Sequence, residues 1–121
     1  MTESDIKLAI HEYLQIMQNQ GKLVFNRLNS GDIIATYGER RARIKLCQEG
    51  TPDFIVHQSA TEEGLIRSHS TFYIEVKHER GKPKLREAQE RFRDMVEHQG
   101  IPVHIVQSVD EVIATIADSL V

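Results

Sequence analysis

Three charged residues, Asp53, Glu75 and Lys77, have the types and spacing that could hold a divalent cation and activate a water molecule. Residues 72–77 (FYIEVK) alternate along the chain as a strand does, so Glu75 and Lys77 are predicted to share one face. Asp53 precedes a short apolar segment that we expect to pair with this strand. Two carboxylates would then supply the oxygen ligands that Mg²⁺ prefers, with an ammonium beside them. For the Glu-x-Lys pair alone, an exposed surface ion pair is the better explanation.

The elements that must position these residues follow from the spacing of apolar side chains. Helices are predicted over 3–19, over 85–98 and after the capping box of Ser108 and Glu111. Strands are predicted over 23–28, 33–37, 41–47, 54–56, 72–77 and 103–107. The order α-β-β-β-β-β-α-β-α predicts an α/β (α+β) fold, with a central mixed sheet flanked by helices in one domain over residues 1–121.

Three details of this arrangement are also predicted. Residues 33–37 should return as a hairpin on 23–28, because Asn29 to Asp32 is typical turn sequence. Residues 57–70 are polar and are predicted to form a loop. The β-α-β segment from 72 to 107 should form a right-handed parallel crossover.

Composition bounds the class of protein. The single cysteine, Cys47, excludes an internal disulfide, and a signal peptide or an apolar run of membrane-spanning length is not found. We therefore expect a cytoplasmic protein with no membrane partner. The net charge is −3, but residues 21–52 carry six Lys/Arg against three Asp/Glu, and residues 77–93 carry seven against three. Such clusters are the footprint of phosphate contact, although charge alone favours an ordinary solvated surface.

Several short motifs together resemble one nuclease family. They are Gly50-Thr51-Pro52-Asp53, Ile74-Glu75-Val76-Lys77, Gln89 on the following helix, Arg27-Leu28-Asn29-Ser30-Gly31, and Glu3 on the first helix. This combination resembles the VRR-NUC branch of the PD-(D/E)XK nucleases over nearly the whole chain. The resemblance implies a restriction-endonuclease-like core. The segment 57–71 departs from the pattern, since it is long and polar for a small member.

The resemblance also implies a mechanism and a substrate. Asp53 and Glu75 would bind Mg²⁺ or Mn²⁺, the carbonyl of Val76 would complete the site, and Lys77 would be the catalytic lysine. The substrate class is branched DNA, either four-way (Holliday) junctions or flaps, whose phosphodiester bonds are hydrolysed. Small stand-alone relatives are generally dimers, so a homodimer is expected.

Two further polar residues are candidates for the site. Glu3 lies within a quarter-turn of the apolar face of the first helix, whereas Glu12 lies half a turn away from Glu3. Glu3 is therefore the better fourth carboxylate, as a ligand or behind the ligands, and a contact with the helix dipole explains it equally well. Gln89 lies on the apolar face of its helix, where its amide needs partners, either at the site or in a structural hydrogen bond.

Basic and polar residues that could contact DNA phosphates lie in four places along the chain. They are Arg27 and Asn29, then Arg40, Arg41, Arg43 and Lys45, then Lys82, Lys84 and Arg86, and finally Arg93. Each one taken singly is better explained as an ordinary exposed surface residue. The acidic segment 94–121 is expected to face away from DNA.

Three functions compete at this point. The first is a metal-dependent endonuclease that acts on DNA junctions or flaps. The second is a non-catalytic nucleic-acid-binding module that retains the nuclease fold, which the intact trio of Asp53, Glu75 and Lys77 disfavours. The third is a structural or partner-binding domain that matches the motifs by chance. Metal-dependent nicking of plasmid and synthetic junctions separates them.

Overall fold

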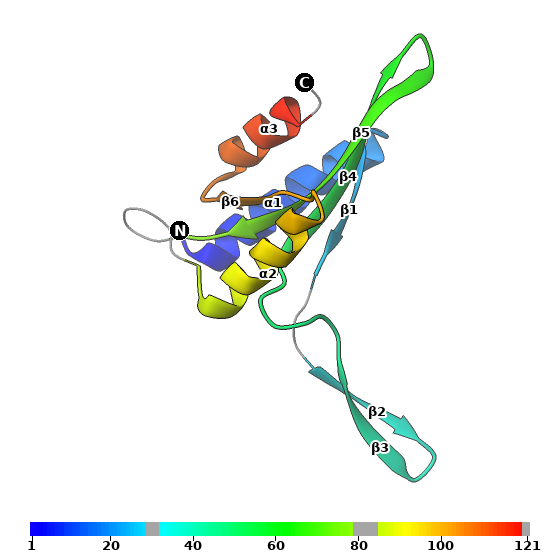
Figure 1. Cartoon of the computed structure of the whole chain (residues 1–121), viewed down its shortest axis with the longest axis vertical. Helices are drawn as coiled ribbons and strands as arrows, with labels where there is room; N and C mark the ends of the chain where they lie inside the picture. Colours follow the sequence, from blue (N-terminus) through cyan, green and yellow to red (C-terminus); the bar gives the residue numbers. More distant parts are fainter. Residues whose placement is uncertain (29–31, 79–84, 120–121) are drawn as a thin grey trace.

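A four-stranded mixed sheet forms the centre of this computed structural model, which describes residues 1–28, 32–78 and 85–119 (Figure 1). Its strand order is β1-β4-β5-β6, comprising β1 (Leu23–Arg27), β4 (Phe54–Glu62), β5 (Leu65–Val76) and β6 (Val103–Val106). β4 is antiparallel to both of its neighbours, whereas β5 and β6 are parallel. The predicted fold class, a mixed sheet flanked by helices, is confirmed.

The described residues form three helices that cover the sheet, and they are α1 (Glu3–Asn19), α2 (Glu87–His98) and α3 (Val109–Asp118). α1 begins at Glu3 because Thr2 and Asp5 form a reciprocal capping box, each side chain accepting from the other's backbone N–H. α3 begins after Ser108, whose hydroxyl accepts from the Glu111 backbone N–H. The observed element order is the predicted one.

The core lies between the sheet and the pair α1 and α3. Apolar side chains at helical spacing from both helices meet every second residue of β4 and β5, namely Ile6, Ile10, Leu14, Val112 and Ile116 against Phe54, Val56, Phe72, Ile74 and Val76. Burial of each such side chain stabilises the fold by about 1.5–3 kcal/mol. The alternate residues of β5 face α2, where the rings of Tyr73 and Phe92 pack edge to face. The core thus lies on one face of β5, and α2 packs on the other.

One predicted strand pairing is wrong. β2 (Asp32–Tyr37) pairs with β3 (Arg40–Lys45) in a separate two-stranded ribbon that extends away from the main sheet (Figure 1), and β1 pairs with β4 instead. A two-residue turn at Gly38, which has φ of +63°, closes this ribbon. β1 joins the core sheet because Leu23 and Phe25 bury their side chains there.

The predicted loop over 57–70 is also wrong, because those residues extend β4 and β5 into one long hairpin. Its turn is Glu63-Gly64, with φ of +52° and +77°, which suits a two-residue hairpin connection. The strands continue beyond the core, so most of their side chains there are exposed although the backbone stays extended. On α2 Phe92 is buried, whereas Met95 is 51% exposed.

Candidate active site

Asp53 and Glu75 meet at one end of the central sheet. Phe54 pairs with Ile74 in antiparallel register. Asp53, which precedes β4, therefore lies beside Glu75 of β5. The Asp53 carboxylate accepts a hydrogen bond from the Val76 backbone N–H at 2.8 Å, and its own carbonyl accepts one from the Leu28 N–H at 2.8 Å. Asp53 is thereby fixed by the strands on both sides. This end of the sheet also holds the carboxyl ends of β5 and β6, where ligands of α/β folds commonly bind.

The turn before Asp53 packs directly on α2. Gly50 has φ of +90°, and a Cβ atom there would lie 2.1 Å from the Ala88 carbonyl oxygen. The hydroxyl and backbone N–H of Thr51 both donate to the Gln48 carbonyl, at 2.6 and 3.2 Å, and so close the turn. Glycine is therefore required here by backbone conformation and by close approach to the helix. The contact sets the position of α2 relative to Asp53.

Glu75 is the electrostatic centre of the site. It is only 5% exposed, and its Oε1 accepts a hydrogen bond from Gln89 Nε2 at 2.9 Å. Burial, followed by the nearby Asp53 carboxylate, raises the pKa of Glu75 to about 8. The positive charges of Lys77 and Lys7 offset part of this rise. An additional cationic charge at this position would therefore favour the ionised carboxylate of Glu75.

Gln89 joins α2 to the site. Its Oε1 accepts from the Arg86 backbone N–H at 2.8 Å, so the amide nitrogen is the atom that faces Glu75. The Gln89 side chain thus accepts a hydrogen bond from the backbone at the start of α2 and donates one to the Glu75 carboxylate. Gln89 thus makes a structural hydrogen bond and contacts Glu75, and its part in an active site stays a prediction.

Lys77 follows the last residue of β5. Its backbone N–H donates to the Val106 carbonyl at 2.9 Å, which continues the pairing with β6. The residue is 6% exposed, and its charge acts on Glu75 two residues earlier. Lys77 is therefore close enough for its charge to act on Glu75, and the predicted place of its ammonium beside two carboxylates stays a prediction.

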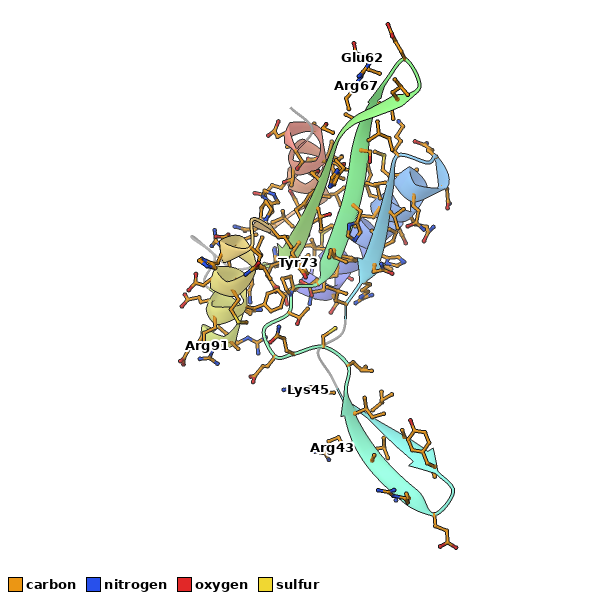
Figure 2. The ribbon with its side chains drawn as sticks, turned by 45° about the vertical axis from the view of Figure 1, so that its right-hand side comes forward. Arg43, Lys45, Glu62, Arg67, Tyr73 and Arg91 are labelled. Carbon is orange, nitrogen blue, oxygen red and sulfur yellow. The ribbon has the colours of Figure 1, made fainter. Side chains whose placement is uncertain are left out.

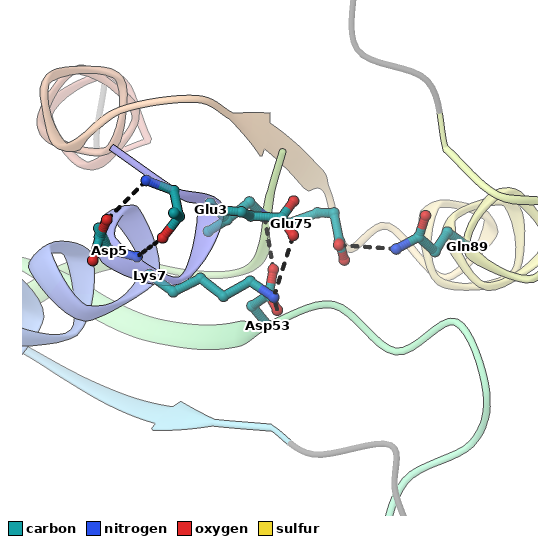
Figure 3. A network of polar contacts seen from close by, with 8 residues as sticks. Glu3, Asp5, Lys7, Asp53, Glu75 and Gln89 are labelled. Carbon is teal, nitrogen blue, oxygen red and sulfur yellow. Dashed lines mark hydrogen bonds and ion pairs between the residues drawn. The ribbon is translucent and has the colours of Figure 1, made fainter. Parts of the chain in front are cut away.

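Glu3 and Lys7 reach the site from the first two turns of α1 (Figure 3). Lys7 Nζ lies 3.0 Å from Asp53 Oδ1 and 4.0 Å from Glu3 Oε2. Glu12 is exposed, which agrees with the predicted helical phase. Sequence reasoning missed Lys7, although its i,i+4 spacing from Glu3 places it on the same side of the helix.

A comparison with protein-family models matches residues 6–110 to the VRR-NUC domain. The chain belongs to the VRR-NUC family. The match includes Asp53, Glu75, Lys77 and Gln89 and leaves Glu3 just outside it. VRR-NUC domains are nucleases of the PD-(D/E)XK superfamily, so this chain carries a nuclease domain. Searches of curated proteins and of solved structures found no match.

The donor set of this VRR-NUC domain fits a hard divalent cation. Among residues 1–28, 32–78 and 85–119, no three His, Cys, Asp or Glu side chains are grouped so that they could hold a metal ion. Two carboxylates are nevertheless sufficient for Mg²⁺, which is commonly held by one or two and keeps several waters. Burial, and after it the neighbouring Asp53 carboxylate, raise the pKa of Glu75, so a cation bound here would favour the ionised form of Glu75.

The predicted DNA contacts fall into two groups. Arg27 pairs in register with Phe54, next to Asp53, and Arg86 precedes α2 beside Gln89, so both are near the site. The second group lies on the exposed strand β3 of the ribbon and comprises Arg40, Arg41, Arg43 and Lys45. Arg93 belongs to neither group, because it lies on α2 and pairs with Glu97. Figure 2 shows Arg43 and Lys45 on the same side of the ribbon. Asn29, Lys82 and Lys84 lie outside the described residues.

None of the helices formed by the described residues has the length and apolarity needed to cross a membrane.

Proposed function

We propose that this VRR-NUC domain is a divalent-metal-dependent, structure-specific endodeoxyribonuclease that hydrolyses phosphodiester bonds in branched DNA. The observation that carries the proposal is the meeting of Asp53, Glu75 and Lys77 at one end of the sheet. Two carboxylates and a lysine at one position suit hydrolysis of a phosphodiester. The preferred substrates in this proposal are four-way junctions or flaps.

Asp53 and Glu75 are the proposed ligands of Mg²⁺ or Mn²⁺, together with the carbonyl of Val76. When bound, such an ion lowers the pKa of a water molecule and neutralises charge on the attacked phosphate. The Val76 N–H holds Asp53 in place, and Gln89 holds Glu75. These hydrogen bonds orient the carboxylates before the ion arrives, which is the usual role of groups behind metal ligands.

Lys77 is the proposed group that orients the attacking water or accepts its proton. Lys77 is buried and its charge acts on Glu75, which supports this role beside a phosphate attacked at the site. Glu3 is the proposed fourth carboxylate. Its contact with Lys7 supports a place behind the ligands rather than among them.

DNA binding is proposed to depend on phosphate contacts from both basic groups. Arg27 and Arg86 flank the site, and the ribbon adds exposed cations farther away. Asn29, Lys82 and Lys84 complete the proposed surface. Contacts to phosphates fix position without reading base sequence, so recognition would depend on the shape of the DNA.

A homodimer is the proposed active form for four-way junctions. Resolution of a junction needs two cuts related by symmetry, and a two-fold dimer provides two sites in that relation. A monomer would suit flaps and other asymmetric branches. Sedimentation with and without junction DNA distinguishes the two forms.

The test is cleavage of a synthetic four-way junction, a flap and a linear duplex in Mg²⁺, in Mn²⁺ and in EDTA. We expect metal-dependent cuts in the branched substrates, and loss of cutting in Asp53→Asn and Glu75→Gln. Junction binding without cleavage in any metal would favour the alternative, a non-catalytic binding module. Full cleavage by Glu75→Gln would contradict the proposed ligands.

A further inference from the structure

The ion pair of Lys7 and Asp53 differs from the other ion pairs of the described residues. Those others lie within one helix or one hairpin, as Arg91 with Glu87 does, and most of their side chains are well exposed. Lys7 and Asp53 come from elements 46 positions apart, and their side chains are 25% and 18% exposed. This partly buried pair lies at the site itself, so it interacts with the charge that the site carries.

The Lys7 ammonium lies close to more than one carboxylate. Its ammonium is 3.0 Å from Asp53 and 4.0 Å from Glu3, its neighbour one helical turn earlier (Figure 3). It also acts on the buried Glu75, whose pKa its charge lowers. The positive charge of Lys7 therefore acts on three carboxylates, those of Glu3, Asp53 and Glu75.

The two oxygens of Asp53 have different partners. Oδ2 accepts from the Val76 backbone N–H, which the strand holds in place, whereas Oδ1 is paired with the flexible side chain of Lys7. Oδ1 is therefore the atom at which a partner can be exchanged without disturbing the sheet. A dication on this oxygen would meet the Lys7 ammonium, and like charges repel strongly in a partly buried site.

We propose that Lys7 is the counter-ion of the metal-free site, and that a divalent cation must displace it from Asp53 in order to bind. This inference rests on the proposed function, because it takes Asp53 and Glu75 to be the metal ligands. Lys7 holds the carboxylates together when no metal is present and lowers the affinity for metal when one arrives. It is a positioning residue that acts through Asp53.

The two roles of Lys7 predict changes of opposite sign. Removal of its charge leaves the Asp53 and Glu3 carboxylates without their cation, so the metal-free protein should lose stability. The same removal abolishes the competition at Oδ1, so the affinity for a divalent cation should rise. A residue with a merely structural role would lower stability without raising the affinity for metal.

The experiment measures Mn²⁺ binding by isothermal titration calorimetry, and thermal unfolding in EDTA and in Mn²⁺, on the full chain. Lys7→Met is the main variant, and Lys7→Gln is a second one that keeps a hydrogen-bond donor without the charge. Lys22→Met is the matched control, since Lys22 is exposed beyond the far end of α1 and forms no ion pair with a described residue. It removes the same charge away from the site.

We expect Lys7→Met to bind Mn²⁺ roughly three- to tenfold more tightly than the natural protein, while Lys22→Met changes little. Its melting temperature in EDTA should fall, and its rise on addition of Mn²⁺ should exceed that of the natural protein. Folding of Lys7→Met only in the presence of Mn²⁺ would also support the proposal. The Gln variant should change in the same direction.

Two results would overturn it. An unchanged Mn²⁺ affinity in both Lys7 variants shows that Lys7 does not compete with metal, and a weakened affinity shows that it helps to assemble the site. Asp53→Asn separates the underlying assumption from the inference. If Asp53→Asn binds Mn²⁺ as the natural protein does, the proposed ligand set is wrong and the Lys7 proposal falls with it.

Discussion

Gln89 Nε2 donates a hydrogen bond to Glu75 Oε1 across 2.9 Å, and this contact links α2 to the carboxylate at the centre of the site. The amide oxygen of the same residue accepts from the Arg86 backbone N–H, so the amide cannot rotate without losing both bonds. The position of α2 therefore determines the orientation of Glu75.

Gln89→Leu should reduce metal-dependent cleavage by roughly 10–100-fold, the usual cost of losing a group that orients a metal ligand. The physical reason is that Glu75 would keep its place in the strand but lose the bond that directs its carboxylate. Single-turnover cleavage of a junction measures the effect. The control is Glu90→Gln, an exposed neighbour on α2, and an equal loss in both variants would contradict the assignment.

Lys77→Met should reduce cleavage by at least roughly 100-fold, the size expected when a general acid–base group is lost. Binding of Mn²⁺ should change little, because the proposed ligands are untouched. Cleavage rates and calorimetric Mn²⁺ titration are measured on the same preparation. Loss of metal binding in parallel with cleavage would assign Lys77 to assembly of the site instead.

The stability of the metal-free protein should fall as pH rises from about 4.5 to about 8, because the pKa of Glu75 rises from its ordinary 4.5 to about 8 on folding. Over this range the folded protein binds a proton that the unfolded chain has released. The contribution of this carboxyl is complete below that window and lost above it. Urea unfolding in EDTA at several pH values should show a smaller decline in Glu75→Gln.

Divalent metal should restore part of that loss at pH 8, since it favours the ionised carboxylate. The Glu75→Gln variant serves as the control, because it lacks the titrating group. Equal pH dependence in both proteins would show that other groups account for the decline.

Gly50→Ala should lower the free energy of unfolding by at least about 3 kcal/mol, since the new Cβ would meet the Ala88 carbonyl and the backbone has positive φ. Gly38→Ala is the matched control. Gly38 also has positive φ, but its Cβ would meet nothing within 4 Å, so a cost of about 1–2 kcal/mol is expected. Urea unfolding compares them, and equal costs would argue against tight packing of the turn on α2.

Arg41→Gln combined with Arg43→Gln should weaken junction binding and flatten the slope of log affinity against log salt by roughly one unit per lost phosphate contact. Both arginines project from the same face of β3, because they are two residues apart in a strand. Arg67→Gln, on the β4–β5 hairpin, is the control. An unchanged salt slope in the double variant would move the DNA surface to Arg27 and Arg86.

The sequence by itself determined the order of the elements, and it indicated Asp53 and Glu75, which lie side by side in the structure. Helical and strand periodicities report which side chains face a core, and this is a local property. The element order and the span of α1 were therefore predictable. The motifs around Asp53 and Glu75 also identified the family that the match over residues 6–110 confirms.

Only the tertiary structure decided which strands pair and which side chains meet at the site. β1 pairs with β4 across a long separation, because burial of Leu23 and Phe25 in the core sheet outweighs the nearer hairpin with β2. The mostly polar residues 57–70 lack the alternation of apolar side chains that marks a core strand. Periodicity therefore could not predict that they extend β4 and β5. Lys7 is the clearest case. Its spacing places it near Glu3, but only the packing of α1 against the sheet brings its ammonium to Asp53.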